Sequence, residues 1–282
     1  MLDRSSRRDC RNHFRAHGLT AMRSFFSVLC SAVLLATCLR AAEPVSDDPL
    51  DPFVGVPAPL AAALRGFGKD APRWAYTQRF IQFDRKGRET DSWVARFDPS
   101  QHYDVQWTLM EKNGQPPTEA QQKKFRKERA KLERKGRVRL GEALEVKRAV
   151  LLPGRAGAED ELTYEVPLRP IEGSKFPPDK FQVFVRIDRE KQALRAIDLK
   201  LRERVRVALV LNVKAADARI EFISVRPDAG PAIARITGGG TASVMLVPVG
   251  GRVEATRSDF LRVTPYDDRF VVKPGPLRTI DF

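Results

Sequence analysis

The sequence has little cysteine and little histidine. The three cysteines, Cys10, Cys30 and Cys38, all lie within the first 42 residues, and His102 is the only histidine after that point. Once those 42 residues are removed, the chain has no disulfide, thiol nucleophile or cysteine metal site. One histidine cannot build a His-rich zinc site, and a Ser-His-Asp triad would depend on His102 alone. We therefore predict a protein that is not an enzyme, with no catalytic residue, metal or cofactor.

Two other patterns of catalytic proteins are incomplete. Carboxylates in or near predicted strands leave a glycosidase-type hydrolase open as an alternative, but no spacing singles out a pair. These residues are Asp91, Asp98, Asp104, Glu161 and Glu165. The GGGT run at 238–241 lacks the lysine and the strand–loop–helix context of a phosphate-binding loop, so we predict a hairpin turn there.

An uncharged run at 25–39 follows basic residues and precedes Ala41 and Ala42. This order is typical of a secretory signal peptide, and the run is shorter than the roughly 20 residues of a membrane span. We predict a signal peptide over 1–42, with Met22 as an alternative start, and a flexible leader over 43–56. Export to the periplasm or the extracellular space follows. Lipid attachment at Cys38 is an alternative, because residues 35–38 approximate a lipoprotein cleavage box.

Basic residues outnumber acidic ones, and the net charge is +14. Without residues 1–42 the chain keeps 43 basic and 34 acidic residues, a balance of +9. Such a charge favours anionic envelope surfaces, including lipid headgroups. We expect no nucleic-acid partner, because the chain is predicted to be exported. The sequence does not indicate an oligomeric state.

Alternating apolar and polar residues dominate from Trp74 onward and predict about ten strands. The run from Trp74 and the run around Trp93, joined by turn residues at 84–88, predict an aromatic hairpin. No β-α-β alternation appears, so a parallel sheet is not expected. We predict a single α+β domain over 57–264, mostly antiparallel β, with a large curved, half-barrel-like sheet and two or three helices. An extended tail over 265–282 follows it.

Two segments predict helices. The first covers 57–67 and is expected to end near Gly66 or Gly68. The second begins at a capping box formed by Thr118 and Gln121 and runs to about Gly136. It is strongly basic and carries few large apolar residues, so we expect it to lie on the surface and touch the domain along one edge.

Two residue sets are candidates for binding. Aromatic residues within the first strands form either core or the lining of an apolar cavity, and both interpretations stay open. These residues are Trp74, Tyr76, Phe80, Trp93, Phe97 and Trp107. If one strand runs from 197 to 206, a row of cations shares one of its faces and offers contacts to an anionic surface. This row contains Lys200, Arg202, Arg204 and Arg206.

Several motifs carry a resemblance to other proteins. The runs WVARFDPS at 93–100, WTL at 107–109, NGQPPT at 113–118 and SDFLRV at 258–263 resemble a group of uncharacterised bacterial exported proteins. The run YTQRF at 76–80 is similar to the opening of the periplasmic lipoprotein-carrier half-barrels, the LolA/LolB and RseB-like proteins. That resemblance implies a curved antiparallel sheet that wraps a helix and holds lipid acyl chains.

The leading hypothesis from the sequence is a noncatalytic cell-envelope protein. It would bind an apolar or amphipathic ligand, such as a lipid or lipoprotein, on a concave sheet face lined by the six aromatic residues. The alternative is a structural or interaction protein that docks on anionic envelope surfaces through the row of four cations and the basic helix.

Overall fold

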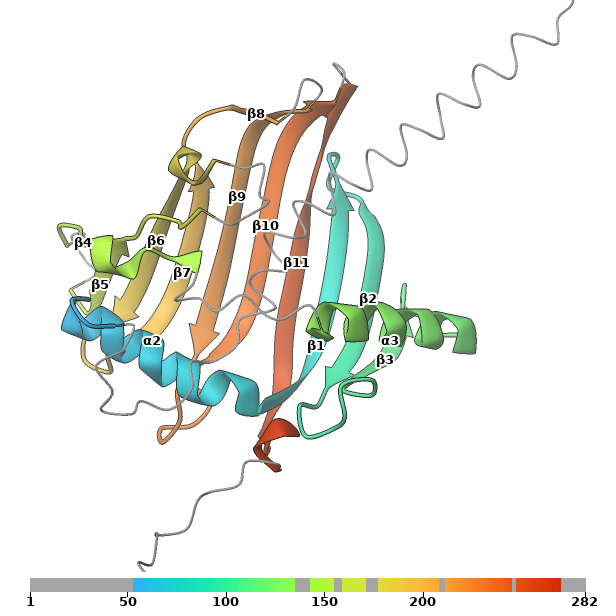
Figure 1. The fold of residues 1–282 in the computed structure, drawn as a ribbon. Helices are drawn as coiled ribbons and strands as arrows, with labels where there is room; N and C mark the ends of the chain where they lie inside the picture. The colour runs from blue at the N-terminus through green and yellow to red at the C-terminus, as the bar shows by residue number, and fades with distance from the viewer. Residues whose placement is uncertain are drawn as a thin grey trace, which may run out of the picture.

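The computed structural model describes residues 53–134, 143–154, 159–170, 177–207, 211–244 and 247–269. The predicted signal peptide, Cys38 and residues 270–282 of the predicted tail lie outside them. The described residues form one open antiparallel sheet of eleven strands and two α-helices (Figure 1). This confirms the prediction of an α+β chain that is mostly antiparallel β.

The strands follow the order β3-β2-β1-β11-β10-β9-β7-β6-β5-β4, with β8 paired to β9. Their bounds are β1 Trp74–Asp84, β2 Glu89–Phe97, β3 Trp107–Lys112, β4 Val150–Leu151, β5 Glu161–Glu165, β6 Phe181–Asp188, β7 Ala193–Leu201, β8 Val205–Val207, β9 Leu211–Ile223, β10 Ala232–Val244 and β11 Val247–Arg262. The predicted aromatic hairpin is β1–β2, and β11 joins it to the rest of the sheet.

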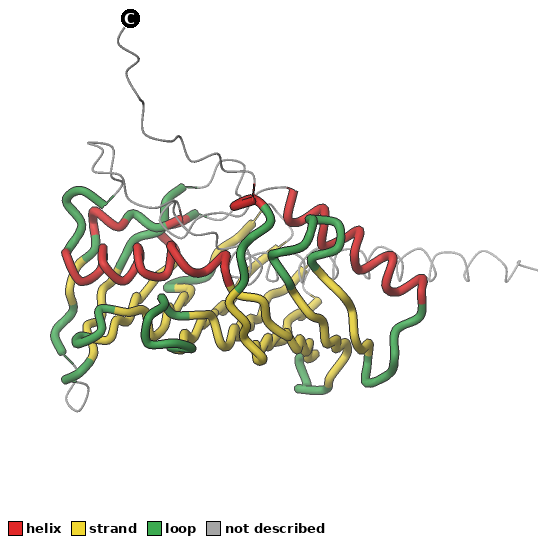
Figure 2. Tube along the Cα trace, turned by 90° about the horizontal axis from the view of Figure 1, so that it is seen from below, coloured by secondary structure: helices red, strands yellow, loops and turns green. Residues whose placement is uncertain are grey.

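Both helices lie on the same side of the sheet (Figure 2). Helix α2 (Ala58–Asp70) packs on β6 and β7, and helix α3 (Glu119–Arg134) packs on β3. The helix-bearing face therefore carries the larger part of the core. Along each strand, core residues alternate with charged and polar residues, whose side chains lie on the opposite face.

Helix α2 does not end at a glycine, as the sequence led us to expect. It continues through Gly66 and Gly68 to Asp70, because Leu60, Leu64 and Phe67 on its buried side hold the helix on the core. Phe67 packs edge-on against Phe222 of β9, with ring centroids 5.2 Å apart. The apolar contact of this face outweighs the low helix propensity of the two glycines.

The capping box of α3 is present. The Thr118 backbone N–H donates to Gln121 Oε1 over 2.8 Å, and the Gln121 backbone N–H donates to Thr118 Oγ1 over 3.3 Å. Phe125 and Arg129 are half-buried and Ala130 is buried, while five basic side chains of the helix are exposed. The prediction of a surface helix that touches the domain along one edge is therefore confirmed.

The predicted hairpin turn at 238–241 is wrong. These residues lie within β10 and pair with β9 on one side and β11 on the other. A Cβ on Gly239 would lie 3.2 Å from the carbonyl oxygen of Gly251, closer than most side-chain carbons approach. The absence of a side chain at Gly239 allows neighbouring backbones to approach closely within the sheet, and Gly239 does not form a turn.

Candidate ligand-binding face

All six predicted aromatic residues lie on the helix-bearing face of β1, β2 and β3. Strand register places Phe80 beside Trp93 and Tyr76 beside Phe97, and Trp107 follows Phe97 on the next strand. The Phe80 and Trp93 rings stack with centroids 5.2 Å apart, and the Phe97 and Trp107 centroids are 4.9 Å apart. The structure thus brings the whole predicted set together in one aromatic cluster.

Helix α3 closes over this aromatic cluster. The Phe125 ring lies 5.2 Å from Trp93, and the Arg129 guanidinium lies over Trp93 at 4.6 Å and over Trp107 at 4.9 Å. Such cation–π contacts anchor a charged side chain on an apolar surface. The sequence predicted that the helix touches the domain along one edge, but nothing in the pattern singled out Arg129 from the other cations of the helix.

Five of the six aromatic side chains are buried core. Trp74, Tyr76, Trp93, Phe97 and Trp107 are at most 7% exposed, and they pack against one another and against neighbouring apolar residues. Phe80 alone of the six is half-buried, and it contacts both this cluster and the core beneath α2. Of the six, Phe80 therefore has the most surface left for a ligand.

Small residues line the middle of the same face, next to Phe80. Pairing of β9, β10 and β11 aligns Ala218 with Gly238, and Ala216 with Gly240 and Gly251. Ala216, Ala218, Gly240 and Gly251 are half-buried. We call Ala216, Ala218, Gly238, Gly240 and Gly251 the small-residue floor. It lies between the strands that α2 covers and the strands that α3 covers, and its side chains are apolar.

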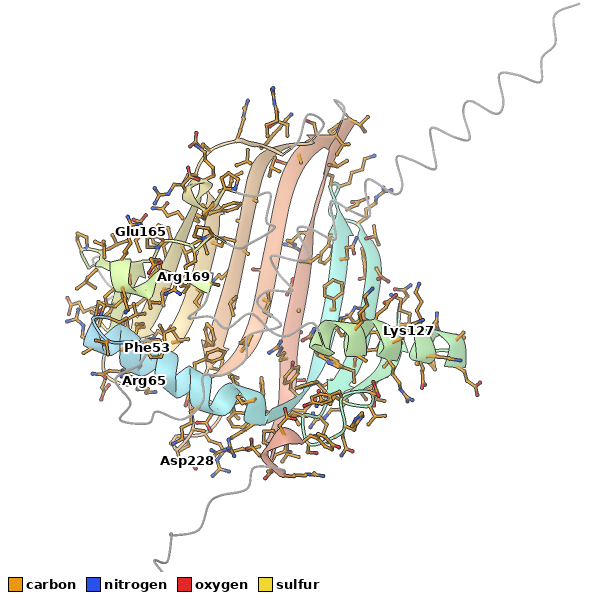
Figure 3. The ribbon with its side chains drawn as sticks, viewed as in Figure 1. Phe53, Arg65, Lys127, Glu165, Arg169 and Asp228 are labelled. Carbon is orange, nitrogen blue, oxygen red and sulfur yellow. The ribbon has the colours of Figure 1, made fainter. Side chains whose placement is uncertain are left out.

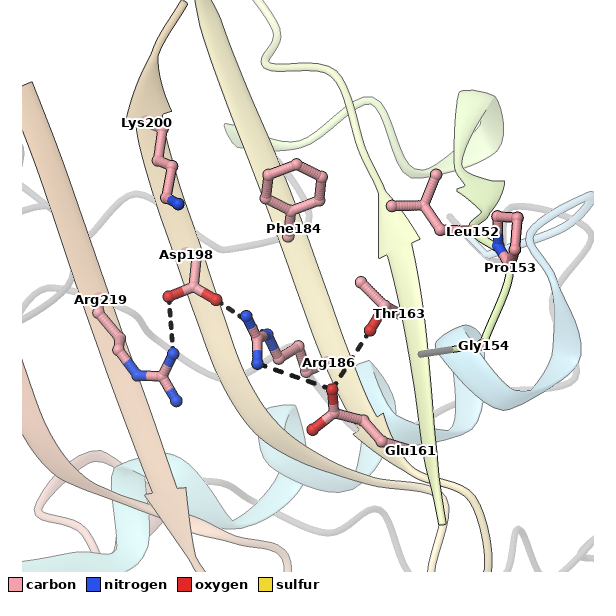
Figure 4. Close-up of a pocket in the computed structure, with 10 residues that line it drawn as sticks. All are labelled: Leu152, Pro153, Gly154, Glu161, Thr163, Phe184, Arg186, Asp198, Lys200 and Arg219. Carbon is pink, nitrogen blue, oxygen red and sulfur yellow. Dashed lines mark hydrogen bonds and ion pairs between the residues drawn. The ribbon is translucent and has the colours of Figure 1, made fainter. Parts of the chain in front are cut away.

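The opposite face of the sheet carries a polar depression of about 360 Å³ over β5, β6, β7 and β9 (Figure 4). Asp198, 6% exposed, lies at its centre. Arg186 Nε is 3.0 Å from Asp198 Oδ2, and Arg219 Nη1 donates to Asp198 Oδ1 over 3.0 Å. Burial lowers the pKa of Arg219, but its bonds to Glu221 and Asp198 more than offset this and raise it. This network offers charges and hydrogen bonds, and it does not suit an apolar ligand.

The predicted row of cations does not occupy one continuous strand. Strand β7 ends at Leu201 and β8 begins at Val205, so Arg202 and Arg204 lie in the connection between them. All four cations, Lys200, Arg202, Arg204 and Arg206, are exposed. Arg202 forms an ion pair with Glu165, and Lys200 lines the polar depression.

Candidate catalytic groups are dispersed. His102 is exposed, with Nδ1 3.6 Å from Asp104. Asp91 pairs with Lys112, and Asp98 accepts a bond of 2.9 Å from the Ser100 backbone N–H. Glu161 lies 3.8 Å from Arg186 and Glu165 pairs with Arg202. Within the described ranges, no three His, Asp or Glu side chains gather as a metal site.

The leader expected over 43–56 contributes to the core at its described end. Phe53 is buried beneath α2, and the guanidinium of Arg65 lies 5.2 Å from its ring centre (Figure 3). Neither described helix has the length and apolarity of a membrane-spanning segment. The chain matches no protein-family model and no curated protein sequence.

Proposed function

We propose that this protein binds an apolar or amphipathic ligand, such as a lipid or a lipoprotein acyl chain, on the helix-bearing face of its sheet, and that it catalyses no reaction. The observation that carries the proposal is the small-residue floor between α2 and α3. Residues without bulky side chains leave the backbone surface open to the contact of a long apolar chain.

The architecture supports this proposal. Long strands β9, β10 and β11 supply the floor, and the aromatic cluster on one side and the core under α2 on the other form its walls. Phe80, which contacts both walls, offers a ring edge to the ligand. Each buried CH₂ of an acyl chain gains about 0.8 kcal/mol, so a chain of ordinary length needs no polar anchor to bind.

The five buried aromatic residues then have the first of the two roles that the sequence left open, that of core. They form the rigid wall that α3 closes, and the ligand lies on the floor beside them. The concave, half-barrel shape implied by the resemblance to lipoprotein carriers would place such a ligand inside the curve of the sheet.

Binding of a fluorescent fatty-acid probe tests the proposal. Ala216 and Ala215 are adjacent on β9 and face opposite sides of the sheet, towards the floor and towards solvent. Ala216→Trp should fill the floor and weaken probe binding at least about tenfold, a loss of roughly 1.4 kcal/mol. Ala215→Trp is the matched control and should bind as the parent does. Equal affinities of the two variants would contradict the proposal.

Native mass spectrometry provides a second, independent test. The protein is purified from a periplasmic extract without detergent, and the mass of the intact complex is recorded. A co-purifying lipid or lipopeptide mass supports the proposal and identifies the ligand. A bare polypeptide that also fails to bind the fluorescent probe would overturn it.

A further inference from the structure

Helix α3 presents a row of lysines to solvent. Lys123, Lys127 and Lys131 are spaced four residues apart, so they follow one side of the helix. All three are exposed. Lys124 and Arg126, also exposed, flank this row. At a rise of 1.5 Å per residue, the row extends about 12 Å. We call Lys123, Lys127 and Lys131 the lysine row.

The lysine row is held in a fixed orientation. Phe125 and Arg129 on the other side of α3 pack on Trp93 and Trp107, and the capping box fixes the first turn. Figure 1 shows α3 crossing in front of β1 and β2 and extending past the edge of the sheet, and Figure 3 labels Lys127 there. The aromatic cluster therefore acts as a base that turns the lysine row outwards.

The charges of the row are not compensated by described residues. None of the three lysines forms an ion pair with a residue that the structure describes. Up to Lys131, where side-chain burial is described, the acidic residues of the helix are Glu119 and Glu128, and both are exposed. Like charges four residues apart destabilise a helix by about 0.2–0.5 kcal/mol per pair. An anionic partner would remove this repulsion, so binding is favoured by charge complementarity.

The composition of the row favours a lipid surface over nucleic acid or a structured acidic protein. Lysine is a compact charge that attracts a negative surface at any orientation, whereas arginine supplies the planar fork used in specific phosphate recognition. A membrane of anionic lipids attracts any positive charge that comes close to its surface. Each cation near the surface contributes about 1 kcal/mol to binding.

We propose that the lysine row of α3 docks this protein on the surface of an anionic phospholipid bilayer. This site lies apart from the small-residue floor and does not depend on the proposed ligand. The proposed site does not include the row of four cations at β7 and β8, in which Arg202 is paired with Glu165 and Lys200 lines the polar depression on the other face.

Vesicle sedimentation tests the docking site. The parent protein is mixed with vesicles of phosphatidylcholine alone, or with vesicles of phosphatidylcholine and phosphatidylglycerol in equal parts. We expect binding to the anionic vesicles that weakens as salt rises, and little to the neutral ones. The triple variant Lys123→Gln, Lys127→Gln, Lys131→Gln should lower the partition coefficient on the order of 100-fold.

The control removes the same charge elsewhere. Lys86, Lys147 and Lys191 are exposed and lie in three other parts of the chain. Changing these three to glutamine should lower binding only a few-fold, through net charge. Glutamine keeps a high helix propensity, and circular dichroism verifies that α3 is intact in the first variant. Equal losses in the two triple variants, or equal binding to neutral vesicles, would overturn the proposal. Neither result bears on the fatty-acid probe.

Discussion

Arg262 donates from Nη2 to Asp70 Oδ1 over 2.6 Å, which joins the last residue of α2 to the last residue of β11. The second oxygen of Asp70 accepts a bond of 2.8 Å from the Gly230 backbone N–H, in the connection between β9 and β10. Asp70 is only 4% exposed. One buried carboxylate thus bonds α2 to the end of β11 and to the β9–β10 connection.

Removal of this carboxylate should destabilise the fold strongly. Asp70→Ala leaves Arg262 without its main partner and the Gly230 N–H without an acceptor, and we expect a loss of about 3 kcal/mol in the free energy of unfolding. Urea denaturation measures this loss. Asp268→Ala is the control, because both side chains of the Arg73–Asp268 pair are 37% exposed, against 5% for the side chain of Asp70. Its loss should cost less than about 1 kcal/mol. Equal costs would show that the Asp70 contacts carry little stability.

Two glycines that touch each other should respond in opposite directions to alanine. A Cβ on Gly230 would lie 2.0 Å from the carbonyl oxygen of Gly66, whereas a Cβ on Gly66 itself meets nothing within 4 Å. Gly66→Ala should therefore raise the stability of α2 by about 0.5–1 kcal/mol. Gly230→Ala should lower stability by at least about 2 kcal/mol. Thermal unfolding of the two variants measures both, and the same sign for both would contradict the contact.

The Asp188 carboxylate at the β6–β7 turn should stabilise the fold at neutral pH and lose this effect in acid. The backbone N–H of Lys191 donates to Asp188, and with Arg195 it holds the pKa of this carboxyl below its ordinary value against the effect of burial. A lowered pKa stabilises the fold above the ordinary value of about 4, and this stabilisation is lost as the pH falls through the folded value. Asp188→Asn should therefore destabilise the protein by about 1–2 kcal/mol at pH 7.

The deficit of Asp188→Asn should shrink as the pH falls below about 4, because the parent carboxyl then also becomes neutral. Urea titrations of the parent and the variant at a series of pH values measure the difference. A deficit that stays constant over this range would mean that the charge of Asp188 does not contribute.

The cation over the aromatic cluster should stabilise α3. Arg129→Met keeps an apolar side chain of similar length but removes the guanidinium from Trp93 and Trp107, and we expect a loss of about 1–2 kcal/mol. Tryptophan fluorescence should shift, because both rings change their surroundings. Arg126→Met changes an exposed arginine one turn away and should stay within about 0.5 kcal/mol of the parent. An unchanged spectrum for Arg129→Met would contradict the packing.

Local patterns in the sequence were sufficient for much of the fold. Alternation around Trp74 and Trp93 predicted the first hairpin, and Thr118 with Gln121 predicted the start of α3, because both depend on neighbouring residues. The two errors, at the glycines of β10 and at the end of α2, arose where the local structure depends on residues far away in the sequence. The three glycines of β10 are strand residues only because β9 and β11 flank them, and α2 passes two glycines because the core beneath it is apolar.

The candidate site was less predictable than the fold. The sequence grouped the six aromatic residues correctly, but whether such a group is core or pocket depends on what covers it. Here Arg129 of α3 covers the aromatic cluster. The sequence of a basic helix does not indicate which of its lysines or arginines has that role. The small-residue floor is formed by three strands together, and no single strand reveals it.

The position of β11 has a consequence for how the chain acquires its structure. Among the described strands, β11 comes last in the sequence, yet it lies between β1 and β10. Within the described sheet it alone links the β1–β3 unit to the remaining strands. Until β11 has emerged, the two parts of the sheet cannot pair, and closing so long a loop is slow. The complete sheet can therefore form only after β11 has been synthesised.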